Sequence, residues 1–248
     1  MLAHDSFRAV ARIGAVLFGL GLAALGVTNF IYSDGVLNLE PVPAGFPGRT
    51  LLVFLSGALL VLAGLALVAG KATRIAAAVL SAVLGYWVLL LQLPRLAGSI
   101  SNGGYWTATA EALALACGAL VVAVRLPALQ SAVRMAFAAC LIVFAALHVV
   151  YRAYVASVIP VWIPGHMFWT FATALAFLLA AGAIATRIRG RLGATLLGVM
   201  SGSWVLIVHV PRVLASPTVR PEWTSLLICL AMSGASLAVA ASLPRSGR

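Results

Sequence analysis

Residues 204–212 read W-V-L-I-V-H-V-P-R, and this stretch decides the fold because a near-copy precedes it. Residues 87–95 read W-V-L-L-L-Q-L-P-R, are identical at five of nine positions and lie 117 residues earlier. The same shift superimposes other features without a gap: Pro43-x-x-x-Pro47-Gly48 on Pro160-x-x-x-Pro164-Gly165, Gly85 on Gly202, Arg74 on Arg191, and Trp106-Thr107 on Trp223-Thr224. A repeat of this length predicts a duplicated helical bundle, with units at 1–128 and 129–248.

The composition places both units in a membrane. Hydrophobic residues make up 63% of the chain, charged residues make up 8%, and the mean hydropathy is +1.12. A helical span needs about 20 mostly apolar residues. Continuous rather than alternating apolar runs indicate helices, not barrel strands. Eight such runs cover 9–32, 51–70, 73–94, 107–124, 133–155, 166–186, 192–214 and 222–243. The sequence therefore predicts an all-α polytopic protein with two parallel, tandem four-helix bundles.

The distribution of basic residues predicts the topology. The chain has 16 Lys and Arg residues against 5 Asp and Glu residues. Eleven fall on the side that holds both termini: Arg8, Arg12, Lys71, Arg74, Arg125, Arg134, Arg187, Arg189, Arg191, Arg245 and Arg248. The other side has five: Arg49, Arg95, Arg152, Arg212 and Arg220. The positive-inside rule then predicts cytoplasmic termini. The basic excess indicates a lipid bilayer with anionic head groups as partner, not nucleic acid.

Function is expected where the copies differ. Gln92 in the first copy corresponds to His209 in the second, and His148 corresponds to an isoleucine. Histidine ligates metals or haem iron, transfers protons and donates hydrogen bonds to carbonyl groups such as those of a quinone. We therefore name His148 and His209 as candidate ligands of a metal or cofactor. The alternative is that each is a packed histidine bonded to a backbone carbonyl.

Each polar residue of the stretch has a glycine seven positions earlier, at Gly85 or Gly202. Residues seven apart lie almost in line on an α-helix, so we expect both polar side chains to point toward a neighbouring helix. The Pro-Arg pair that follows should end each helix, because the residue before proline is disfavoured in the α region. That would place Arg95 and Arg212 at the outer boundary of the membrane.

Two further groups join the candidates. Glu111 lies five residues past Trp106 in a predicted span, and an intramembrane carboxylate is a functional candidate unless it is wetted from outside. Tyr151 lies three residues after His148 on the same predicted helical face. The predicted cofactor-binding set is His209, His148, Arg212, Gln92, Glu111, Arg95, Trp204 and Tyr151, and the sequence identifies no catalytic residue.

The second copy resembles the DoxX-like membrane proteins. The resemblance rests on V-I-P-x-W-I-P-G at 158–165, the following Phe168-Trp169, and H-x-P-R at 209–212. It implies a bacterial inner-membrane four-helix unit, here duplicated, in a family linked with quinone-coupled thiosulfate oxidation and with complexes that manage oxidative stress. The residues that match the motif are Pro160, Trp162, Pro164, Gly165, His209, Pro211 and Arg212.

These observations favour a redox-associated membrane subunit with an outward-facing pocket for a quinone or haem. Membrane or soluble redox partners and a homo-oligomer both remain open. A carrier or permease for a small solute or metal is the alternative, and a scaffold that recruits soluble partners is a third. Polar intramembrane residues lie near one face only, which argues against a transport path. No phosphate loop, dinucleotide fingerprint or hydrolase elbow is present.

Overall fold

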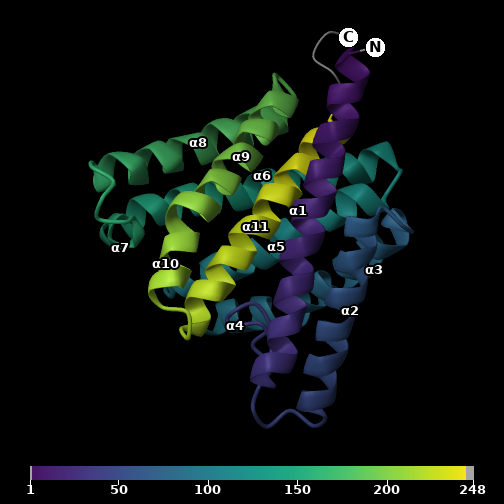
Figure 1. Ribbon diagram of the computed structural model, residues 1–248, viewed down its shortest axis with the longest axis vertical. Coiled ribbons are helices and arrows are strands. Elements are labelled where there is room, and N and C mark those ends of the chain that lie inside the picture. The colour runs from purple at the N-terminus through teal and green to yellow at the C-terminus, as the bar shows by residue number, and fades with distance from the viewer. Residues whose placement is uncertain (1, 244–248) are drawn as a thin grey trace.

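In the computed structural model, residues 2–243 are described, with side chains from residue 9 onward, and this part is helical without strands. The helices are α1 (Leu2–Tyr32), α2 (Arg49–Ala69), α3 (Thr73–Tyr86), the π-helix η1 (Trp87–Gln92), α4 (Leu93–Gly98), α5 (Gly103–Ala123), α6 (Pro127–Val150), α7 (Arg152–Val158), α8 (His166–Thr186), α9 (Gly190–Trp204), the π-helix η2 (Val205–His209), α10 (Val210–Ala215) and α11 (Arg220–Ser242) (Figure 1). The predicted all-α class is confirmed for the described residues. Eight helical segments among them are long and apolar enough to cross a membrane, which supports the predicted multi-pass architecture.

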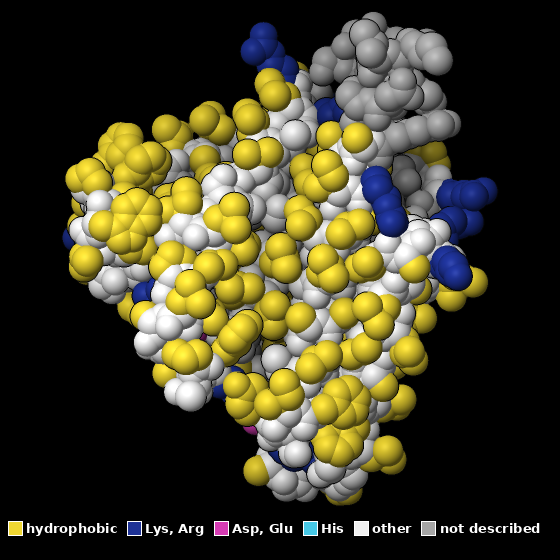
Figure 2. Space-filling view, viewed as in Figure 1, with side chains coloured by type: hydrophobic (Ala, Val, Ile, Leu, Met, Phe, Trp, Pro, Cys, Tyr) yellow, Lys and Arg dark blue, Asp and Glu magenta, His cyan; other side chains and the backbone are white. Residues whose placement is uncertain are grey.

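The outer surface is apolar, as a lipid-facing surface should be. Leu51, Leu62 and Leu206 are 74%, 68% and 69% exposed, respectively. Water-soluble proteins bury most large aliphatic side chains, whereas lipid tails solvate them without cost. Hydrophobic side chains spread over most of the face seen in Figure 2, while several Lys and Arg side chains gather near the end where the chain termini lie. This pattern supports an integral membrane protein.

The helices of the two sequence halves interleave. α1 packs against α2 and against α11, the last helix of the second half, while α6 packs against α8 and against α5, the last helix of the first half. α5 and α11 also contact each other. They are the two most buried spans, which fits a position at the centre of the molecule. Each half therefore shares its core with the other.

Small residues allow the close approach of α1 and α11. A Cβ atom added at Gly234 would lie 2.2 Å from the backbone nitrogen of Phe18, and one at Gly21 would lie 2.7 Å from the nitrogen of Ala231. Close packing of small residues stabilises helix association in lipid, where the hydrophobic effect between helices is absent. The glycines of the first helix thus serve a contact between the halves as well as the contact with α2.

The element boundaries repeat with the interval found in the sequence. A shift of 117 residues moves α2 onto residues 166–186, the bounds of α8, and moves α4 onto residues 210–215, the bounds of α10. Both halves also have a π-helix before the proline. The Leu93 N–H donates to the carbonyl of Val88, and the Val210 N–H donates to that of Val205. These are i→i−5 bonds of the π type.

The π-helices correct two expectations. The helices do not end at the Pro-Arg pairs but continue through α4 and α10. The wider turn before each proline accommodates the ring and its missing N–H, which would otherwise break the helix. It also shifts the register, so residues seven apart are no longer aligned. A Cβ at Gly85 would meet nothing within 4 Å, and one at Gly202 would lie 3.2 Å from Ser233 Oγ. Gly85 therefore does not mark a face in close contact with a neighbouring helix, and that expectation was wrong.

The described ends of α1 and α11 lie at the same end of the molecule (Figure 1), as an even number of spans requires. Three basic residues used for the topology prediction, Arg8, Arg245 and Arg248, lie outside the part whose side chains are described. The assignment of this end to the cytoplasm stays a prediction.

Candidate functional site

A cavity of about 380 Å³ lies between the helices of the second half and α5, toward the end of the bundle away from the termini. His148 of α6, His209 at the end of η2 and Glu111 of α5 all line it, as does Trp204. Four of the eight predicted cofactor-binding residues therefore share one cavity. They come from three separate spans, so only the folded helices bring them together.

The two histidines have different hydrogen bonding. His148 Nδ1 is 2.8 Å from the carbonyl oxygen of Phe144. Because a carbonyl only accepts, Nδ1 is the donor, and Nε2 of the neutral ring remains an acceptor. His209 Nδ1 is buried and has no hydrogen-bond partner among the described residues. A buried polar atom without a partner costs free energy, and such an atom beside a cavity is a natural contact for a ligand.

Aromatic rings form much of the cavity wall. Trp169 and Trp204 meet edge to face with ring centroids 6.0 Å apart. Phe177 lies 5.6 Å from Phe144 and 5.3 Å from the His148 ring, centroid to centroid. All of these residues line the cavity. Walls of this kind accept a flat, apolar ring, and the few polar groups between them would fix its orientation.

The cavity also contains polar residues that sequence reasoning missed. Cys229 of α11 lines the cavity and donates through Sγ to the Ser201 carbonyl oxygen, 3.2 Å away. Thr170 and Thr173 face the cavity from α8. Single hydroxyl and thiol groups in apolar helices resemble ordinary packing residues. Thr170, Thr173 and Phe177 are spaced so that they share one face of a helix, and this spacing was the only signal in the sequence that the two threonines line the cavity.

Arg212 and Tyr151 lie outside the cavity lining. The Arg212 guanidinium donates to both carboxylate oxygens of Glu222, over 2.7 Å and 2.6 Å, and to the Val158 carbonyl oxygen over 3.3 Å. It therefore braces the helix end one turn beyond His209. Tyr151 interrupts the predicted fifth span with φ −102° and ψ 30°, between α6 and α7. Its ring instead lies beside Gly103, where an added Cβ would come within 2.2 Å of it.

Gln92 and Arg95 occupy the first half, away from this cavity. Gln92 is fully buried and donates from Nε2 to the carbonyl oxygens of Asn38 and Leu39, over 2.5 Å and 2.9 Å. Arg95 stacks over the Tyr105 ring at 4.0 Å. The Gln92 side chain therefore anchors the loop that follows α1.

That loop is more buried than its polar, proline-rich sequence suggests. Val36, Leu39 and Glu40 are buried. Glu40 accepts hydrogen bonds from Ser56 Oγ over 2.5 Å and from Asn29 Nδ2 over 2.8 Å. The apolar residues beside Glu40 were the signal that this segment folds inward.

The two carboxylates of this loop have opposite electrostatic environments. Burial raises the pKa of Glu40, although hydrogen bonds from Ser56, Asn29 and the Val36 N–H act against the rise. For Asp34, partial burial alone would raise the pKa, but hydrogen bonds and charges from Arg220 and Arg49 outweigh it, so the pKa is lowered. The loop thus holds a buried carboxyl group with a raised pKa and an ion-paired carboxylate with a lowered pKa at its edge.

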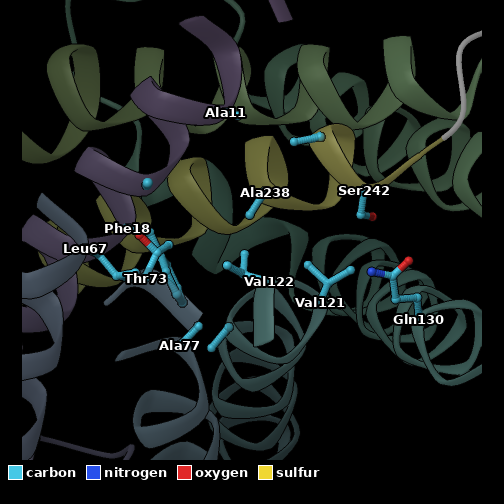
Figure 3. Close-up of a pocket in the computed structure, with 13 residues that line it drawn as sticks. Ala11, Phe18, Leu67, Thr73, Ala77, Val121, Val122, Gln130, Ala238 and Ser242 are labelled. Carbon is cyan, nitrogen blue, oxygen red and sulfur yellow. The ribbon is translucent and has the colours of Figure 1, made fainter. Parts of the chain in front are cut away.

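A second cavity, of about 360 Å³, lies at the end of the bundle that holds the termini. Its lining is almost wholly apolar, from Ala11 and Phe18 to Ala238, with Thr73, Gln130 and Ser242 as the polar side chains (Figure 3). Gln130 already donates to the Val124 carbonyl oxygen. This cavity lacks titratable groups, so the histidine-lined cavity is the better candidate site.

Among the described residues, no three His, Cys, Asp or Glu side chains converge as a metal site. Metal binding by His148 and His209 stays a prediction. No protein-family model, curated protein or solved structure matches the chain. The site must therefore be interpreted from its own geometry.

Proposed function

We propose that the chain is a redox-associated membrane subunit whose second-half cavity binds a quinone head group. The observation that carries this proposal is the meeting of His148, His209 and Glu111 on an aromatic-lined cavity. A quinone needs a flat apolar slot and polar groups that bond its two carbonyl oxygens, and its reduction also needs proton donors. The cavity offers each of these features within the membrane, where quinones dissolve.

Haem is the alternative cofactor, because imidazole is also a common haem ligand. The His148 geometry leaves Nε2 available as an acceptor, which suits either a quinol hydroxyl or a metal ion. The unpartnered Nδ1 of His209 suits a quinone carbonyl in the tautomer that carries the proton on Nδ1, because that nitrogen then donates a hydrogen bond.

The proposal includes the organisation and setting inferred from sequence. The repeated boundaries of α2 and α8, the repeated π-helices and the 117-residue interval support a tandem duplication of a four-helix unit. The short motifs at 158–165 and 209–212 support a DoxX-like bacterial inner-membrane protein, and the basic residues at one end support cytoplasmic termini. The cavity would then open toward the outer side.

The test is the cofactor content of the protein purified from membranes in mild detergent. We expect a quinone in the lipid extract by chromatography, reduced strongly in the His209→Leu variant. His166→Leu is the matched control, because His166 also belongs to the second half but is absent from the cavity lining and bonds the Pro160 carbonyl oxygen. A Soret band in the absorption spectrum of the purified protein would identify haem as the cofactor in place of quinone. Absence of both would reject the proposal.

A further inference from the structure

The first half contains a filled counterpart of the cavity. Shifting by 117 residues pairs Ser56 with Thr173, Trp87 with Trp204 and Gln92 with His209. The members in the first half are all buried, and two of them, Ser56 and Gln92, form hydrogen bonds with the segment 38–40. Ser56 bonds the Glu40 carboxylate, and Gln92 bonds two backbone carbonyl oxygens of the segment. The Trp87 indole lies near Glu40 and acts against the rise in the pKa of Glu40 that burial causes. Its N–H nevertheless has no hydrogen-bond partner among the described residues.

The corresponding residues in the second half have no such partner. Thr173 and Trp204 line the open cavity, and the buried Nδ1 of His209 is unpaired among the described residues. The reason lies in the segment itself. Residues 35–41 of the first half correspond to α7, Arg152–Val158, which has no buried residue. The segment of the second half lies at the cavity wall instead, where Tyr154, Val155 and Val158 line the cavity. Among the described residues it forms no hydrogen bond with Thr173 or Trp204, and His209 Nδ1 stays unpaired.

We propose that the segment 38–40 is a built-in stand-in for the ligand, so that the second-half cavity takes an apolar molecule with two uncharged oxygen acceptors. One oxygen accepts from His209, as the carbonyls of the segment accept from Gln92. The other accepts from Thr173 and Trp204, as Glu40 accepts from Ser56. This assignment rests on the proposed function and specifies which atoms of the quinone are recognised.

The ligand is uncharged because the cavity offers no free cation. No Lys or Arg belongs to its lining, and the nearby Arg212 is paired with Glu222. A carbonyl oxygen can accept hydrogen bonds from His209, Thr173 and Trp204 without the free-energy cost of burying a charge.

The test titrates the full chain in lipid nanodiscs with three probes that share a similar apolar tail: decylubiquinone, methyl decanoate and decylbenzene. We expect binding of the quinone, weaker binding of the ester and none of decylbenzene, which has no oxygen. Thr173→Val and Trp204→Phe should each weaken quinone binding roughly tenfold, as expected for one buried hydrogen bond. Thr173→Ser should restore it, which separates a hydrogen bond from a packing effect. Ser56→Ala and Trp87→Phe, the counterparts around Glu40, should leave the affinity of the folded protein unchanged.

The outcomes separate this inference from the proposed function. Quinone binding that needs His209 but ignores Thr173 and Trp204 would overturn the inference and leave the quinone proposal standing. Ester binding that depends on both residues, without quinone binding, would support the inference and reject the quinone. Equal binding of decylbenzene would overturn the inference, because an oxygen acceptor would then be unnecessary.

Discussion

Arg220 and Asp34 join the last span of the protein to the loop after the first. Arg220 Nη1 donates to Asp34 Oδ2 over 3.1 Å, and Nη2 donates to the neighbouring Gly35 carbonyl oxygen over 2.5 Å. Arg49, at the start of α2, pairs with the other oxygen of the same carboxylate. Arg220 of the second half therefore holds the loop between α1 and α2 of the first half in place. This contact agrees with the packing of α1 against α11.

Asp34→Asn should weaken this closure. The carboxylate is partly exposed, so the expected loss in the free energy of unfolding at pH 7 is at most about 1 kcal/mol. The folded state lowers the pKa of Asp34, so its contribution exists above the ordinary pKa near 3.8 and is lost as the pH falls through the folded value. Thermal unfolding in detergent should show a parent–variant difference at pH 7 that shrinks toward pH 3. A constant difference would contradict the ion-pair explanation.

Glu40 should show the opposite pH dependence. Its raised pKa means that its contribution is complete below the ordinary value near 4.5 and is lost as the pH rises through the folded value. Glu40→Gln should remove this dependence and retain the fold. An amide can donate to Ser56 Oγ, whose own hydroxyl can then donate to the Val53 carbonyl oxygen at 3.0 Å. Glu40→Ala should cost about 1–3 kcal/mol, because it removes the acceptor that Ser56, Asn29 and the Val36 N–H share, and the Val36 N–H has no other hydrogen-bond partner among the described residues. Equal melting of the two variants would show that the loop does not depend on this network.

Gly234→Ala tests the contact between the halves. The added Cβ would lie 2.2 Å from the Phe18 backbone nitrogen, a group that cannot move without displacing α1. Overpacking typically costs about 1–3 kcal/mol, and contact with backbone places this variant at the upper end. Gly85→Ala is the control, because its Cβ would meet nothing within 4 Å. Similar melting temperatures for both variants would mean that α1 is free to separate from α11.

The sequence predicted the spans well because their signal is local: a continuous apolar run of sufficient length needs no knowledge of its neighbours. The inward fold of Glu40 and the break at Tyr151 depend on tertiary contacts, so they were missed. The π-helices explain a further error. A single wide turn before Pro94 and Pro211 leaves hydropathy unchanged but alters which residues share a face. Four of the eight predicted residues line one cavity, and the difference between the copies at His209 was a local signal for them. The contacts of Gln92 and Arg95 depend on a loop that only the first half folds inward.

Arg212→Lys should affect stability more than ligand binding. The guanidinium forms two nearly parallel bonds to Glu222, over 2.7 Å and 2.6 Å, and an ammonium group cannot reproduce this planar fork. We expect a loss of about 1 kcal/mol in the free energy of unfolding, consistent with a partly exposed pair. Quinone affinity of the folded protein should change less than about threefold, because Arg212 is absent from the cavity lining. A larger drop in affinity with unchanged melting would place Arg212 in the binding site.

His209 separates hydrogen bonding from other chemistry. Leucine removes the donor, so His209→Leu should weaken quinone binding at least about tenfold. His209→Gln makes the second half copy the first, where Gln92 donates from Nε2 to two carbonyl oxygens. If His209 acts as a donor to a ligand carbonyl, glutamine should keep the affinity within about threefold of the parent. Titration of both variants in nanodiscs decides the point. If quinone binding is lost in both variants, the site needs an imidazole as such, and a simple donor role for His209 would be rejected.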